Sequence, residues 1–233
     1  MSASATVFNS SGPVSQVGDP TLRLRCASVL KPLYAWVVDD HPRWWELAAA
    51  AICRSSNAAT DELVSHAGGH QQVAGRLAAR TDVTLRPAAT WGQFPVVASE
   101  LAQLYAALQA AAQQGDSRAC AVLSLLRHVR PAQRFSLPPL WAHLTGQDPA
   151  AVGTKAGWDL SDGQPLLHTH AAVVGPQVSV AVVTAVDLTF RQRRRWRATL
   201  RAGGPEAVAA VHRRYAGRLL REAVSAASTS GAR

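Results

Sequence analysis

Ser28-Val29-Leu30-Lys31 places a serine and a lysine three residues apart, and two further short motifs follow it along the chain. Ser55-Ser56-Asn57 comes next, and Lys155-Ala156-Gly157 lies much later. Each pattern alone is common by chance. Their order, an S-x-x-K followed by an S-x-N and a Lys-small-Gly, carries far more information, and it decides how the rest of the sequence is interpreted.

The spacing of Ser28 and Lys31 suits a nucleophile and its base. Residues i and i+3 lie on one face of a helix, so the two side chains meet if a helix begins near Ala27. A serine hydroxyl is a weak nucleophile that needs a base within hydrogen-bond reach. Lysine becomes such a base when burial and a nearby cation lower its pKa, and Lys155 would be that cation. Pro32 fits the first turn of this helix.

Strands and helices are expected in a defined order around these motifs. Strands are predicted at 5–9, at 14–24 with a break at Gly18-Asp19-Pro20, around Lys155, at 166–174 and at 178–186, with a turn at Ser11-Gly12-Pro13. Helices are predicted at 43–54, from 57 to the Gly68-Gly69 pair, and at 70–80, 99–114, 116–128, 190–201 and 206–226. The segments 82–95 and 131–149 are expected to be irregular.

A nucleophile after two strands, a polar motif among helices and a third motif on a later strand resemble the penicillin-recognising serine acyltransferases. This superfamily includes the class A β-lactamases and the D-alanyl-D-alanine peptidases, and the resemblance covers nearly the whole chain. It implies an α+β fold of the β-lactamase/transpeptidase type, with an antiparallel sheet flanked by terminal helices plus a helical half. It also implies one domain, 1–233, whose sheet-containing half spans about 1–40 and 145–233 and whose helical half spans about 41–144.

The resemblance assigns a catalytic role to four motif residues. Ser28 resembles the nucleophile that becomes acylated, and Lys31 resembles the base that activates it. Ser55 resembles the shuttle that passes a proton to the leaving group. Lys155 resembles the cation that tunes Ser55 and attracts a substrate carboxylate.

Substrate-binding roles follow from the same resemblance. Asn57 resembles the ligand of the substrate's amide carbonyl. Ala156, Gly157 and Trp158 would lie beside the substrate on the third motif's strand. The backbone N–H groups of Ser28 and Trp158 would form an oxyanion hole, which meets charge that develops only in the transition state.

Two departures from the family pattern bear on the substrate. The third motif usually carries Thr or Ser where this chain has Ala156, so one hydrogen bond to a carboxylate is lost, about 1.5–3 kcal/mol. Class A β-lactamases also carry a glutamate that activates the deacylating water, in a loop that corresponds to 82–95. Between Arg80 and Ser99 the only carboxylate is Asp82, and Glu100 is expected to be a first-turn acid of the next helix. Fast β-lactam hydrolysis is therefore not expected.

Composition and charge indicate a globular protein without a predicted membrane span. The chain has 233 residues, 48% of them apolar, and no run of about twenty apolar residues. The net charge is +9, and much of it lies in the basic segment 191–201. We expect this segment to be a solvated helix face rather than a nucleic-acid footprint, because no nucleic-acid-binding module accompanies it. Attraction to anionic surfaces stays open as an alternative.

No metal or other cofactor is predicted. The three cysteines, Cys26, Cys53 and Cys120, have no metal-ligand spacing and are expected to be buried small side chains. His66 and His70 are four residues apart, but the Gly68-Gly69 pair interrupts the helix that would align them. His168 and His170 alternate along a strand that we expect to lie beside the strand of Lys155.

The leading hypothesis is a serine hydrolase or acyltransferase that acts on a small amide, peptide or ester through an acyl-Ser28 intermediate. It would be D,D-peptidase-like or β-lactamase-related, able to form a β-lactam adduct but without efficient deacylation. The alternatives are a catalytically quiet binding or scaffold protein of the same fold, and a β-lactamase with an unidentified base. No secretory signal is visible, which predicts a cytoplasmic protein unless the chain is a mature or trimmed form. The sequence does not indicate an oligomeric state.

Overall fold

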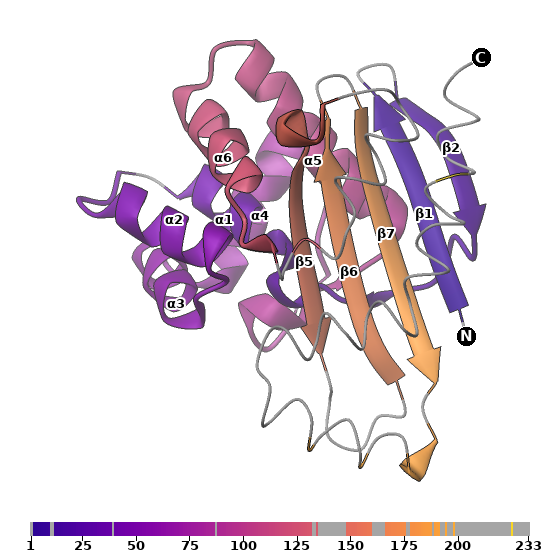
Figure 1. Cartoon of the computed structure of the whole chain (residues 1–233). Coiled ribbons are helices and arrows are strands. Elements are labelled where there is room, and N and C mark those ends of the chain that lie inside the picture. The colour runs from indigo at the N-terminus through magenta and orange to yellow at the C-terminus, as the bar shows by residue number, and fades with distance from the viewer. Residues whose placement is uncertain are drawn as a thin grey trace.

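A five-stranded antiparallel sheet forms one side of the molecule (Figure 1). The computed structural model describes residues 2–9, 12–38, 40–86, 88–131, 134, 148–159, 166–175, 178–187, 189–191, 194, 198 and 225, and every structural statement concerns these residues. The strands are β1 (Ser2–Asn9), β2 (Gly12–Gly18), β5 (Gly153–Asp159), β6 (Leu166–Val174) and β7 (Val178–Asp187). Their order is β2-β1-β7-β6-β5, so the two ends of the sequence build one sheet and β5 lies at its edge.

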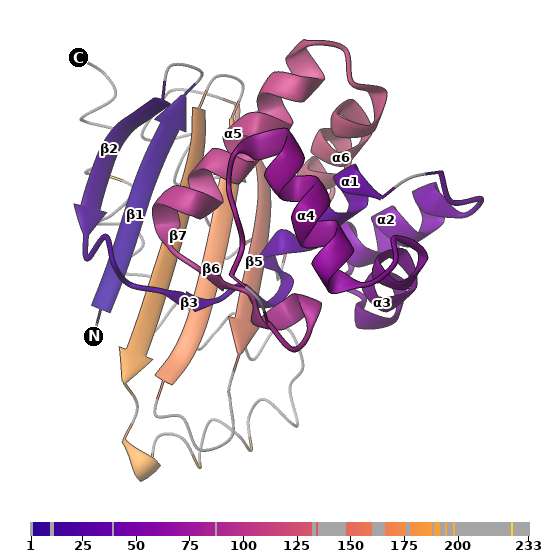
Figure 2. The ribbon, with the colours of Figure 1, turned by 180° about the vertical axis from the view of Figure 1, so that it is seen from behind.

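The helices lie on one face of this sheet and beyond its β5 edge (Figures 1 and 2). They are α1 (Lys31–Val37), α2 (Trp44–Cys53), α3 (Asn57–His66), α4 (His70–Thr81), α5 (Ala98–Gln113) and α6 (Ser117–Arg127). Helix α5 crosses the sheet and contacts β1, β6 and β7, whereas α6 packs on β5. In the described part of the chain no helix combines the length and hydropathy needed to cross a bilayer.

Helix α1 is the centre of the helical half. All seven of its residues are buried, and α2, α3, α4, α5 and α6 all contact it. Its sequence, Lys31-Pro-Leu-Tyr-Ala-Trp-Val, is almost entirely apolar, which is typical of a helix that is surrounded by protein. Proline sits within its first turn, where a missing backbone N–H costs nothing. The lysine at its start is therefore the exception in an apolar helix, and it lies at the end that faces β5.

A small second sheet anchors the chain just before Ser28. Strand β3 (Leu24–Arg25) pairs with β4 (Pro95–Val96), and the ladder is extended by a hydrogen bond of 2.8 Å from the Cys26 N–H to the Phe94 carbonyl. The sequence did not predict β4, because two residues are too short for a periodic pattern. The segment 82–95, expected to be irregular, otherwise forms only a 3-10 turn at Trp91–Gln93 among its described residues. The pairing brings this segment against the Ser28 turn.

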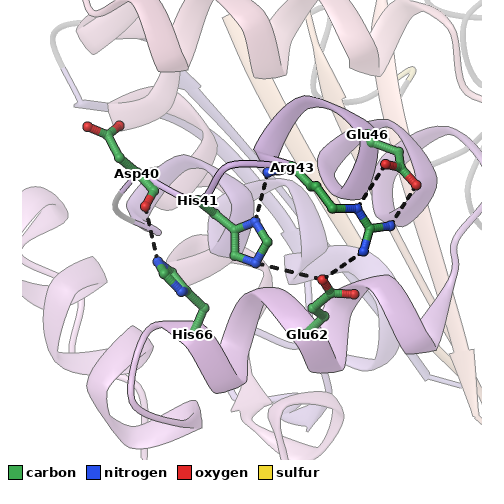
Figure 3. Close-up of polar contacts among 6 residues, drawn as sticks. All are labelled: Asp40, His41, Arg43, Glu46, Glu62 and His66. Carbon is green, nitrogen blue, oxygen red and sulfur yellow. Dashed lines mark hydrogen bonds and ion pairs between the residues drawn. The ribbon is translucent and has the colours of Figure 1, made fainter.

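A surface network fastens the connection between α1 and α2 onto α3 (Figure 3). Its six members are Asp40, His41, Arg43, Glu46, Glu62 and His66. Arg43 pairs with Glu46 at 2.7 Å and with Glu62 at 3.2 Å, and His41 Nε2 lies 3.7 Å from Glu62. Exposed ion pairs contribute little free energy each. Several of them together hold α2 and α3 in a fixed relation, and the turn between these helices carries the second motif.

Most predicted elements are found within one or two residues of their expected ends. Strand β6 spans the predicted 166–174, and α6 begins after Asp116, whose side chain accepts a hydrogen bond from the Ala119 N–H as an N-cap. The predicted turn at Ser11-Gly12-Pro13 is wrong in part, since Gly12 and Pro13 already belong to β2 and pair with Asn9 and Phe8. Nearly all of the predicted helices 190–201 and 206–226 lies outside the described residues, as does most of 131–149.

Candidate active site

Ser28 lies in a 3-10 turn, Ala27–Leu30, that runs directly into α1. The Lys31 N–H donates to the Ser28 carbonyl, and in a 3-10 turn residues i and i+3 eclipse. The expected helical start near Ala27 is therefore present, although its first turn is tighter than an α-helix. Ala27 has a φ of +46°, a left-handed conformation that is costly for a residue with a Cβ. This strain marks the turn that presents Ser28.

The Lys31 ammonium group reaches the second motif. Its Nζ donates to the Ser55 backbone carbonyl and to Asn57 Oδ1, both at 2.7 Å, and lies 3.5 Å from Ser55 Oγ. The Lys31 side chain is fully buried. Two strong charge-assisted hydrogen bonds therefore hold the lysine in one position between the turn and the start of α3.

The turn between α2 and α3 is shaped to present Ser55 and Asn57. Ser55 has a φ of +57°, which reverses the chain after α2. The next residue, Ser56, caps α3, since its hydroxyl accepts a hydrogen bond of 3.2 Å from the Ala59 N–H. Asn57 is the first residue of α3. The S-x-N motif thus places one polar residue on each side of a helix cap.

Lys155 joins the same cluster from the edge strand β5. Its Nζ donates to Ser55 Oγ at 2.9 Å and to the Ala156 carbonyl at 3.3 Å, and its side chain is fully buried. The Ser55 hydroxyl therefore lies between two lysines. The structure brings the three motifs, which are distant in sequence, into direct contact.

Burial lowers the pKa of both lysines. The pKa of Lys155 falls to about 7, because burial disfavours its charged form and the Lys31 charge adds to this effect. Burial lowers the pKa of Lys31 to about 8, and the Asp61 carboxylate acts in the opposite direction. Near neutral pH the pair can therefore hold a proton on one nitrogen and accept a proton on the other.

Gly157 is the point of closest approach between β5 and the Ser28 turn. A Cβ at this position would lie 2.8 Å from the Cys26 carbonyl oxygen and the Ser28 backbone nitrogen, and 2.9 Å from the Val29 nitrogen. Backbone atoms cannot yield as a flexible side chain can, so only glycine fits. This contact places Ala156, which is buried, and Trp158, which is half-buried, on β5 next to the turn.

Replacing Gly157 with alanine is expected to push β5 away from the turn. We expect a loss of about 1–3 kcal/mol in unfolding free energy from overpacking, and a fall of about 10²-fold in the rate at which probes acylate Ser28, because the groups around it are displaced. Urea unfolding and intact-mass kinetics measure the two effects. Gly75→Ala is the matched control: a methyl group at this position in α4 would meet no neighbouring atom within 4 Å, so labelling should stay intact. Wild-type stability and labelling in Gly157→Ala would contradict the prediction.

Two residues at this site were not predicted from the sequence. Trp91 places its ring centroid 5.0 Å from Lys31 Nζ, and its indole N–H donates to Asp61 Oδ1 at 2.6 Å. Asp61 lies one turn after Asn57 on α3. In the sequence Asp61 looked like an ordinary helix residue, and Trp91 lay in a segment without a period. Only the spacing of Asp61 from Asn57, i to i+4 on one helix face, could have indicated it.

Of the two carboxylates near the segment that carries Trp91, Glu100 is engaged with other groups and Asp82 is exposed. Glu100 pairs with Arg23 through both of its oxygens, each at 2.8 Å, and accepts a hydrogen bond from the Val97 N–H at the start of α5. It is the first-turn acid that the sequence predicted. Asp82 is exposed and follows the last residue of α4 in a left-handed conformation.

The histidines have separate partners. His66 Nε2 lies 3.2 Å from the Asp40 carbonyl and His70 Nε2 lies 3.0 Å from the Ala88 carbonyl. His168 and His170 lie on β6 beside β5, as expected, with His170 opposite Gly157. Across the described ranges, no group of three or more His, Cys, Asp or Glu side chains could hold a metal ion. Cys26 is buried as expected, but Cys53 is only half-buried and the expectation is wrong for Cys120, which is exposed.

Known proteins resemble this chain in their three-dimensional structures, whereas comparisons by sequence find no match. No protein-family model matches the sequence, and no curated protein matches it. A class A β-lactamase from Bacteroides cellulosilyticus aligns with a TM-score of 0.60 at 15% identity, covering 96% of this chain and 92% of that one. The TLA-3 extended-spectrum β-lactamase aligns with a TM-score of 0.60 at 12% identity, covering 80% and 85%. A variant of a reconstructed ancestral class A β-lactamase of Gram-negative bacteria gives 0.56 at 16% identity, covering 89% of each chain.

These alignments span most of each chain, and they match the α+β arrangement that the motifs predicted. Identities of this size establish the fold and leave the activity to be argued from the site. The chain therefore has the fold of the class A β-lactamases.

Proposed function

We propose that the protein is a serine acyltransferase or hydrolase that forms an acyl-Ser28 intermediate with an amide, peptide or ester. The observation that carries this proposal is the buried chain Lys31–Ser55–Lys155, in which a hydroxyl lies between two lysines of lowered pKa. Such an arrangement can take up one proton and deliver another near neutral pH. A purely structural role does not explain two buried lysines in one cluster, since burying unpaired ammonium groups is costly.

The proposed acylation step uses the three motifs in sequence. Neutral Lys31 accepts the proton of Ser28 Oγ while the oxygen forms a bond to the substrate's carbonyl carbon. The bond from that carbon to the leaving nitrogen or oxygen then breaks. Ser55 gives its proton to the leaving group and is reprotonated from the lysine pair. Atoms and charge balance without any further reactant.

The proposed substrate contacts come from Asn57, from Ala156 and from backbone N–H groups beside Ser28. Asn57 Oδ1 is occupied by Lys31, which leaves the Asn57 amide Nδ2 to donate to a substrate carbonyl. The backbone N–H groups of Ser28 and Trp158 form the proposed oxyanion hole, and the contact at Gly157 is what keeps them adjacent. Ala156 offers no hydroxyl to a substrate carboxylate. A D,D-peptidase-like reaction on a peptide or related amide or ester is the finer form of the proposal.

Two covalent probes test the proposal. The wild-type protein is incubated separately with a fluorescent penicillin and with a fluorophosphonate, and adducts are detected by intact mass and mapped by peptide mass spectrometry. We expect adducts on Ser28. If neither probe forms an adduct on a folded protein, the chain is a catalytically quiet binding or scaffold protein, and the proposal is wrong.

Slow release of β-lactam adducts is expected. Among the described residues of 80–99, no carboxylate reaches Lys31, so deacylation lacks a carboxylate base from this segment and depends on Lys31 alone, whereas a positioned general base contributes about 10²–10⁴-fold. Nitrocefin hydrolysis should therefore be slow, and a penicillin adduct should persist through mass measurement. Rapid catalytic turnover would contradict this and would support the second candidate, a β-lactamase like the structural neighbours. In that case Asp82→Asn would determine whether Asp82 is the missing base.

A further inference from the structure

The indole of Trp91 covers a side of Lys31 Nζ that its two strong hydrogen-bond acceptors leave open. Two of the Lys31 N–H groups donate to Ser55 O and Asn57 Oδ1, and the ring centroid of Trp91 lies 5.0 Å from the nitrogen. An ammonium group over an indole face is held by cation–π attraction. Because Lys31 is fully buried, this ring is part of what excludes water from the lysine.

Trp91 is held in place at both its backbone and its ring. Its carbonyl accepts hydrogen bonds from the buried Tyr34 hydroxyl at 2.5 Å and from Cys26 Sγ at 3.3 Å. The Tyr34 ring packs edge-on against the indole, with centroids 6.3 Å apart. The indole N–H donates to Asp61 Oδ1 at 2.6 Å. These contacts fix the orientation of the ring, so its position over Lys31 does not depend on the lysine alone.

Hydrolysis and acyl transfer place different acceptor molecules beside the indole of Trp91: water in the first, and an amine or alcohol in the second. In both, an O–H or N–H group attacks the acyl carbon, its proton passes to Lys31, and Ser28 Oγ leaves the carbon and takes a proton back from Lys31. A water molecule beside an indole face loses its hydrogen-bond partners on that side. An amine or alcohol with an organic body gains apolar contact with the half-buried ring.

We infer that Trp91 is a specificity-determining residue that keeps water from the acyl-Ser28 intermediate and favours transfer of the acyl group to an organic amine or alcohol. Asp61 is a positioning residue that orients the ring through its hydrogen bond. The inference rests on the proposed acyl-Ser28 chemistry, which it refines by naming the class of acceptor.

The first test compares adduct lifetimes. After acylation with the fluorescent penicillin and removal of excess probe, Trp91→Ala should lose its adduct at least about tenfold faster than wild type, because water reaches Lys31. Trp91→Phe keeps an aromatic face but loses the hydrogen bond to Asp61, so its adduct should be lost at a rate between those of wild type and Trp91→Ala. Added primary amine should capture a larger fraction of the acyl group in wild type than in Trp91→Ala. Trp45→Ala, an exposed tryptophan on α2, is the control and should change nothing.

The second test works without acylation. Acetic anhydride should modify Lys31 of the resting protein faster in Trp91→Ala than in wild type, measured by peptide mass spectrometry. Asp61→Ala should expose Lys31 and shorten the adduct lifetime in the same direction as Trp91→Ala, but by less. Asp61→Asn keeps an oxygen acceptor for the indole N–H, so at a pH well above about 8, where Lys31 is neutral in both proteins, it should restore a wild-type adduct lifetime.

The outcomes separate the two proposals. If no probe acylates Ser28 but Lys31 becomes exposed in Trp91→Ala, the proposed function fails and the covering role of Trp91 stands. If Ser28 is acylated but Trp91→Ala leaves the adduct lifetime and amine capture unchanged, the inference is overturned, whatever happens to Lys31.

Discussion

Ser28→Ala should form no adduct with either the fluorescent penicillin or the fluorophosphonate. The mechanism gives the acyl group one attachment point, the Ser28 hydroxyl, and alanine offers no atom that can form the bond. The other nucleophiles nearby are unsuited. Burial raises the pKa of the Cys26 thiol to about 12, so its thiolate is not available near neutral pH. The Ser55 hydroxyl is already held by Lys155.

The control for this change is a serine outside the site. Ser65→Ala removes an exposed hydroxyl from α3, near the end of that helix away from Asn57, and should keep wild-type labelling. Thermal unfolding of both variants separates loss of a nucleophile from loss of the fold. An adduct that survives in Ser28→Ala, or that maps to Cys26 in the wild type, would refute the assignment of Ser28.

The parts of the site that the sequence predicts are those that local patterns encode. The spacing of Ser28 and Lys31 indicates a shared helical face, and the residues around Lys155 indicate a strand. The meeting of Lys31, Ser55 and Lys155 is long-range. It could be expected only because the three motifs occur in the order seen in a known family, since their periodicity carries no information about contacts between them.

Trp91 and Asp61 show what local patterns cannot provide. Their contact joins α3 to the short 3-10 turn Trp91–Gln93, and it depends on the two-residue pairing of β3 with β4 that carries this turn past Ser28. Hydrophobic periodicity does not describe such a path, and a lone tryptophan in a stretch without a periodic pattern gives no sign of what it contacts. The sequence showed that segment 82–95 contains no glutamate. It did not show that Trp91 of this segment lies beside Lys31.

Lys31→Met should slow acylation of Ser28 by about 10²–10⁴-fold, the usual contribution of a general base. Methionine keeps much of the length of the side chain but cannot accept a proton. The fluorophosphonate is the appropriate probe, because it is neutral and its binding does not depend on the charge of Lys155. Circular dichroism and thermal unfolding establish that the variant is folded. A labelling rate within roughly threefold of wild type would contradict the assignment of Lys31 as the base.

The pH dependence of labelling ties this effect to Lys31 itself. Only the neutral amine can accept the Ser28 proton, so the wild-type rate should rise with pH and level off above about 8, where burial has placed the pKa of Lys31. Lys31→Met should lose this rise. Asp61→Asn removes the negative charge that raises the pKa of Lys31, so its rise should move to lower pH. A structural role for Lys31 predicts neither change. A pH profile that is the same in all three proteins would therefore assign the base to another group.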